Sequence, residues 1–171
     1  VTAVADAPTL AVSAPHSDTG VETIISNNST PFTGGGFTRT IDGWQTDSDA
    51  LEQHTTYTAS EGDWYFELNT DAIGHFPDAA NMYQEIATHD GADYTLTFDF
   101  SARPGIDAST SRIEVLWDGV AVDTISADGT GLSDTSWSTF TYNFTGNGDL
   151  TRLELREAGT DLNYGRGGFV D

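Results

Sequence analysis

The feature that most constrains the fold of this chain is an alternation of apolar and polar residues with a period of two. In YTLTFDF, residues 94–100, Tyr, Leu and two Phe side chains share one face, while Thr and Asp share the other. WYFEL (64–68), RIEVLW (112–117) and FTYNF (140–144) repeat the pattern. Because successive side chains of a strand point to opposite faces, each segment predicts a strand with one buried face. Only PDAANMYQEIA is ambiguous with a helix, and its second half also favours a strand.

Turn signals such as Asp90-Gly91 and Asp118-Gly119 separate these segments, so we expect an all-β protein built as an antiparallel β-sandwich, or jelly roll. The expected strands are 21–26, 36–41, 51–57, 63–69, 82–88, 93–101, 112–117, 120–126, 136–145, 149–158 and 168–171.

Long and short connections alternate between these strands, apart from a long first connection at 27–35. In an antiparallel sandwich, alternate connections lie at opposite ends. The long connections should therefore gather at one end, where loops on a rigid scaffold commonly carry function. They are 42–50, 70–81, 102–111, 127–135 and 159–167.

The charge of the chain excludes some partners. The 171 residues include 27 acidic and 6 basic ones, for a net charge of -21, which repels nucleic acids and anionic membranes. The same charge attracts cations, although solubility alone is a sufficient reason for it. No run is long and apolar enough to insert into a membrane, and the absence of cysteine excludes disulfides and thiolate sites.

Oxygen-rich side chains in the long connections predict a calcium site. Asn69 and Asp71 follow one strand, and Asp47 and Asp49 lie in the first long connection. Ca²⁺ takes about 6–8 oxygen ligands in proteins, although single Asp and Asn residues in loops more often cap turns. Asp171, which follows the last apolar pair, is either a further calcium ligand or only a residue at the end of the last strand.

Planar and aromatic side chains in the same connections are candidates for ligand binding. Arg103 and Arg166 offer planar donors for a carboxylate or a sugar hydroxyl, and Asn163 lies beside Tyr164. Tyr164 and Trp44 offer flat faces on which a sugar ring could stack. Trp44 is also a candidate for the core, where Trp is more often found, and Arg103 could instead hold loop backbone.

Catalysis has little support in the sequence. Neither a nucleophile elbow, a zinc-protease motif nor a phosphate loop is present, and the four histidines are scattered. The sequence therefore favours a binding protein over an enzyme.

Several motifs, in this order, resemble the galactose-binding-like jelly-roll modules of bacterial RTX adhesins over residues 20–171. They are GW at 43–44, YFELNTD at 65–71, MYQEIAT at 82–88, YTLTFDFSARPG at 94–105, IEVLWDGVAVDTI at 113–125, Trp137 and GGFVD at 167–171. VTAVADAPTL is similar to the junctions that follow cadherin-like repeats, so residues 1–19 are expected to be a linker or the end of a preceding repeat.

The resemblance implies an extracellular, calcium-dependent adhesion module within a long surface protein, with neighbouring domains in the same chain. It implies one structural calcium ion and matches Asp171 to the aspartate of the usual D-N-V ending, which is cut short here. A cell-surface glycan is the expected ligand. The alternatives are the C-terminal residues of a peptide and, as a second alternative, no ligand in a structural spacer.

Overall fold

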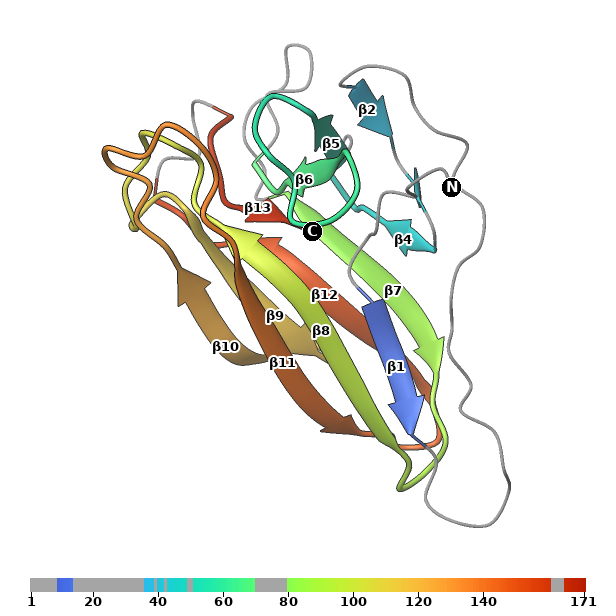
Figure 1. The fold of residues 1–171 in the computed structure, drawn as a ribbon. Coiled ribbons are helices and arrows are strands. Elements are labelled where there is room, and N and C mark those ends of the chain that lie inside the picture. Colours follow the sequence, from blue (N-terminus) through green and yellow to red (C-terminus); the bar gives the residue numbers. More distant parts are fainter. Residues whose placement is uncertain are drawn as a thin grey trace.

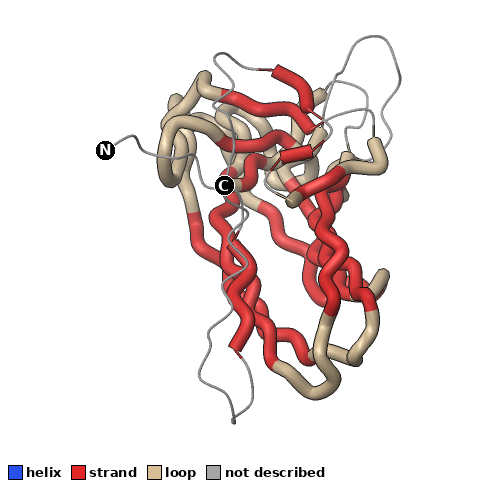
Figure 2. The backbone as a smooth tube through the Cα atoms, turned by 90° about the vertical axis from the view of Figure 1, so that its right-hand side faces the viewer, coloured by secondary structure: helices blue, strands red, loops and turns tan. Residues whose placement is uncertain are grey.

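Two antiparallel sheets face each other in the computed structural model, which confirms the predicted β-sandwich (Figures 1 and 2). The structure describes residues 9–13, 36–38, 40–41, 43–48, 51–69, 80–160 and 165–171. These residues include no helix, and therefore no helix that could span a membrane.

The first sheet is built around the long strand β8, which pairs with β1, β11 and β13. Beyond β13, the order continues through β6 and β5 to β2. The strands are β1 (Thr9–Ser13), β2 (Gly36–Thr38), β5 (Leu51–His54), β6 (Tyr65–Glu67), β8 (Asp93–Ser101), β11 (Ser138–Thr145) and β13 (Phe169–Val170).

The second sheet has the order β10-β9-β12-β7-β4-β3. Its strands are β3 (Thr40–Ile41), β4 (Trp44–Gln45), β7 (Asn81–Ala87), β9 (Arg112–Trp117), β10 (Val120–Ser126) and β12 (Leu150–Glu157).

The predicted bounds of β8, β9 and β10 agree with the structure to the residue. β5 and β6 are shorter than the strands predicted at 51–57 and 63–69, and the strand predicted at 21–26 lies outside the described residues. The single strand predicted at 36–41 is wrong, because these residues form β2 and β3 in different sheets. β1 falls within the stretch 1–19 that was expected to be a linker or a preceding repeat, and its backbone pairs with β8.

The core lies between the two sheets and follows the alternation. Leu96 and Phe98 of β8 point inward and belong to the same cluster as Val115 of β9 and Leu155 of β12. Burying an aliphatic or aromatic side chain of this size stabilises a fold by about 1.5–3 kcal/mol. Trp44 is also part of this cluster and is fully buried.

The described parts of the loops that follow β8, β10 and β12 gather at one end of the sandwich, together with residues 68–69 and 80, and we call this end the loop pole (Figure 1). Its described residues are 68–69, 80, 102–111, 127–137, 158–160 and 165–168. Gly105 N donates to Gly129 O at 2.8 Å, and Thr160 N donates to Ser109 O at 2.9 Å, so three loops are joined by their main chains. The predicted gathering is confirmed for the described parts of the connections 102–111, 127–135 and 159–167. The predicted connection 42–50 instead contains the strand β4, and most of 70–81 lies outside the described residues.

Candidate functional site

The outer face of the first sheet is buried beside the loop pole. Strand pairing places Glu52 opposite Glu67 and Glu67 opposite Phe169. Because side chains alternate, all three point away from the core. Glu67 is nevertheless 0% exposed and Phe169 1% exposed. Segments outside the sheet must therefore cover this face.

Aromatic side chains form much of that cover. The Tyr65 ring lies 4.7 Å from the Phe169 ring and 5.6 Å from the ring of Trp137, which belongs to the loop after β10. Trp137 Nε1 donates to Thr58 O at 2.8 Å and so holds the connection between β5 and β6 against that loop. This second apolar cluster lowers the local polarity around Glu67.

The buried Glu67 carboxylate is surrounded by donors. Arg103 Nη1 lies 2.7 Å from both of its oxygens, and Gly167 N donates to Oε1 at 2.8 Å. His54 Nε2 lies 2.9 Å from Oε2. A buried carboxylate is tolerated when it is paired and hydrogen-bonded in this way. Arg103 also donates to Gly165 O at 3.2 Å, so it holds both a carboxylate and loop backbone.

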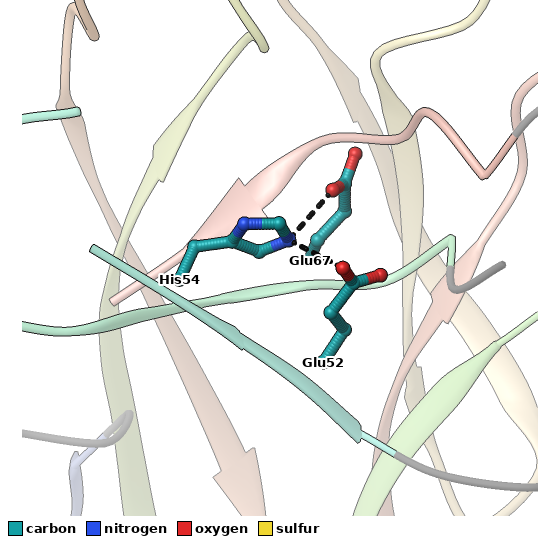
Figure 3. A group of neighbouring side chains, drawn as sticks. All are labelled: Glu52, His54 and Glu67. Carbon is teal, nitrogen blue, oxygen red and sulfur yellow. Dashed lines mark ion pairs between the residues drawn. The ribbon is translucent and has the colours of Figure 1, made fainter. Parts of the chain in front are cut away.

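His54 lies between two carboxyl groups, as Figure 3 shows. Its Nε2 is 3.1 Å from Glu52 Oε1 as well as 2.9 Å from Glu67 Oε2. Burial opposes protonation of the ring, but the two carboxylates outweigh burial and raise the pKa of His54 to about 9. At neutral pH, the positive charges of the protonated His54 ring and of Arg103 thus neutralise the negative charges of Glu52 and Glu67.

Glu52, His54 and Glu67 could also hold a metal ion, because one donor atom from each lies within 4.8 Å of the others. A metal would have to displace the His54 proton and compete with Arg103 for Glu67. The sequence analysis missed this group and treated Glu67 as part of a polar face. The available signal was Glu-x-His on one predicted strand beside a Glu on the next.

A second buried carboxyl group lies at the same pole but comes from the other sheet. Glu157 ends β12 and is 2% exposed. Its Oε1 accepts a hydrogen bond from Gly159 N at 2.6 Å, whereas its Oε2 has no hydrogen-bond partner among the described residues. Burial, together with the charge of Glu67, raises the pKa of Glu157 to about 8.

Asn69 and Arg103 both bind the main chain of the segment 165–167, which contains Arg166. The buried Asn69 donates from Nδ2 to Arg166 O at 3.3 Å, while the Arg166 side chain is exposed. Asp71, Asp49, Asn163 and Tyr164 lie outside the described residues, so their roles stay predictions.

Asp47 has contacts in the second sheet, not with Asn69. Its Oδ2 lies 2.6 Å from Arg152 Nη1 and accepts from Asn81 Nδ2 at 3.4 Å. The predicted combination of Asp47 with Asn69 at one metal ion is therefore not seen. This carboxylate instead ties β4 to β7 and β12.

Two further predicted site residues have structural roles. The predicted stacking of Trp44 on a ligand is wrong, because its ring is fully buried in the core. Asp171 Oδ2 accepts from Ser60 N at 2.7 Å and Glu61 N at 3.0 Å, so it holds the connection between β5 and β6.

Comparisons with solved structures found sandwiches of low sequence identity. A family 35 carbohydrate-binding module from Clostridium thermocellum is 16% identical, with 81% of this chain and 95% of the module covered, at a TM-score of 0.47. The K3 cleaved adhesin domain of Lys-gingipain from Porphyromonas gingivalis is 14% identical, with 75% of this chain and 88% of that domain covered, at a TM-score of 0.46. A family 16 carbohydrate-binding module is 13% identical, with 71% and 81% covered, at a TM-score of 0.44.

No protein-family profile and no curated protein matches the chain. Because every reported TM-score is below 0.5, the fold assignment rests on the strand pairing itself.

Proposed function

We propose that this domain is a calcium-dependent ligand-binding module of a large extracellular bacterial adhesin, and that it binds cell-surface glycans. The observation that carries the proposal is the loop pole, where three loops are joined by main-chain hydrogen bonds on a rigid sandwich. Such a platform is preorganised, so a ligand that binds it loses little affinity to ordering of the protein. A structural spacer has no need of long loops at one end.

The exposed polar side chains of the loop pole suit a ligand with many hydroxyl groups. Asp107 and Asp128 are exposed in neighbouring loops, and hydrogen bonds fix both carboxylates. Hydrogen bonds with Ser109 and Thr130, respectively, are the main reason that the pKa of each is lowered, so both stay ionised and accept hydrogen bonds. Thr160 adds a hydroxyl, and the exposed Arg166 adds planar donors. Sugar hydroxyls can bind to both kinds of group.

Peptide recognition is the second candidate, and Arg166 favours it. An exposed guanidinium beside a cation site would suit the terminal carboxylate of a peptide. Arg103 contributes less to either ligand than the sequence suggests, because its Nη1 is already paired with Glu67.

The test is a glycan-array screen of the purified domain, run once in millimolar calcium and once in EDTA. The proposal expects hits that disappear in EDTA. Arg166→Ala should weaken these hits, whereas Arg156→Ala, which removes the same charge from the second sheet, should not. An array without hits, followed by calcium-dependent binding to a library of free peptide C-termini, would favour the second candidate. If neither library gives hits, the proposed function is wrong.

A further inference from the structure

The buried carboxyl group of Glu157 is only partly satisfied by the fold. The side chain is almost completely removed from water at the end of β12, and its Oε2 has no hydrogen-bond partner in the described part of the chain. Leaving a buried acceptor unsatisfied typically destabilises a protein by about 1–3 kcal/mol, and more if it is charged. A carboxyl group in this position therefore calls for a ligand or a proton.

The backbone around Glu157 leaves room for its carboxyl group. A methyl group at Gly167 would lie 2.7 Å from Glu157 Oε2 and 2.7 Å from Asn69 Cβ, and a methyl group at Gly159 would collide with Glu157 Oε1. Glu157 Oε2 and Asn69 thus lie on the same side of Gly167. The two side chains come from different sheets, because Asn69 follows β6 and Glu157 ends β12.

The electrostatic surroundings favour a cation at this place. The negative charge of Glu67 acts on Glu157. Arg103 and His54 face Glu67 and are already paired with it. Among the described residues, no arginine or histidine is paired with Glu157, and the protein as a whole carries a charge of -21. A cation bound by Glu157 would therefore be attracted to its carboxylate without competition from an arginine or histidine.

We propose that Glu157 and Asn69 bind a hard divalent cation, which ties the end of β12 in the second sheet to the end of β6 in the first. A carboxylate and an amide oxygen are donors that Ca²⁺ accepts, and water can complete its coordination. This inference rests on the calcium dependence in the proposed function and identifies the residues responsible for it. Such a cation would hold the two sheets together directly beneath the loop pole.

The experiment uses Ca²⁺ as the probe and needs no glycan or peptide, so it is independent of the ligand assignment. Isothermal titration calorimetry and thermal unfolding are run on the whole chain at pH 7.5 after treatment with EDTA and its removal. We expect Ca²⁺ to bind and to raise the Tm of the wild type, and we expect Glu157→Gln to weaken binding at least tenfold. Without calcium, Glu157→Gln should be as stable as the wild type or more stable, because it removes a buried ionisable group.

Asp47→Asn is the matched control, because Asp47 is a carboxylate of the second sheet whose partner is an arginine. It should leave calcium affinity unchanged. Wild-type affinity in Glu157→Gln overturns the inference but leaves the proposed function standing. A wild type that does not bind Ca²⁺ overturns the inference and also removes calcium dependence from the proposed function, and Glu157 then simply holds a proton.

If Glu157→Gln fails to fold, Asn69→Ala still tests the inference, because it removes the second proposed ligand. We expect Asn69→Ala to weaken calcium binding measured by calorimetry. Wild-type calcium affinity in Asn69→Ala would overturn the inference.

Discussion

Arg103 and Glu67 form an ion pair in which a single nitrogen, Nη1, lies 2.7 Å from both carboxylate oxygens. Glu67 is fully buried, whereas the Arg103 side chain is 28% exposed. The pair links the loop after β8 to β6, and the same guanidinium reaches Gly165 O in the last long loop. The loop pole is therefore fixed to the sheet through a buried charge.

Loss of Arg103 should destabilise the domain strongly. Arg103→Ala leaves Glu67 buried without its main counterion, and breaking a buried pair in this way costs about 3–5 kcal/mol. Arg156→Ala is the control, because its pair with Glu114 is partly exposed and should contribute at most about 1 kcal/mol. Urea denaturation measures both. The double variant Arg103→Ala, Glu67→Gln should recover part of the loss, and equal losses for Arg103→Ala and Arg156→Ala would contradict the prediction.

The stability of the domain should fall as the pH rises from about 6.5 to about 9. The pKa of His54 is raised from 6.5 to about 9 in the folded state, so its contribution is complete below pH 6.5 and is lost as pH rises through 9. After allowance for solvent screening, the loss is on the order of 2 kcal/mol. The raised pKa of Glu157 acts in the same direction between pH 4.5 and about 8.

The free energy of unfolding, measured in calcium-free buffer at several pH values, tests this dependence. His54→Gln should flatten the curve between pH 8 and 9, and Glu157→Gln should flatten it at lower pH. A wild-type curve that rises with pH over this range would show that His54 is not held protonated by Glu52 and Glu67.

Asp171 should control the order of the connection between β5 and β6. Its Oδ2 accepts two main-chain hydrogen bonds, from Ser60 and Glu61, and Asp171→Ala removes this shared acceptor. We expect a loss of stability of about 1–3 kcal/mol. Amide hydrogen exchange should accelerate at residues 60 and 61 and stay unchanged in the turn at 146–149. Unchanged protection at residues 60 and 61 would contradict this role.

Asp71 is expected to contribute to calcium affinity and, through it, to ligand binding. It lies two residues after Asn69 in the sequence, and carboxylates are the preferred protein ligands of Ca²⁺. Asp71→Ala should weaken calcium binding at least tenfold by calorimetry and reduce the calcium-dependent glycan signal. Asp47→Asn serves again as the control. Unchanged calcium and ligand binding in Asp71→Ala would remove this residue from the site.

The loop pole could be predicted because its cause is local. Alternation along β8 reveals which residues are strand, and the turns that follow β8, β9 and β10 then predict at which end their connections lie. Arg103, Asn69 and Arg166 were selected from the long connections, and the first two do bind the main chain of the segment 165–167, which contains Arg166. The strands depend on the alternation of apolar and polar residues, which can be seen directly in the sequence.

The environments of single side chains could not be predicted in the same way. Glu67 alternates with core residues, which predicts an exposed side chain, yet it is buried and contacts Arg103 and Gly167 from distant parts of the chain. Glu157 ends a strand like many surface carboxylates, and its burial follows from its contact with a loop of the opposite sheet. Periodicity in the sequence was enough to predict the long strands β8 to β10 and the gathering of the loops that follow β8 and β10. Which carboxylates are buried followed from the three-dimensional arrangement alone, because burial depends on segments that lie far away in the sequence.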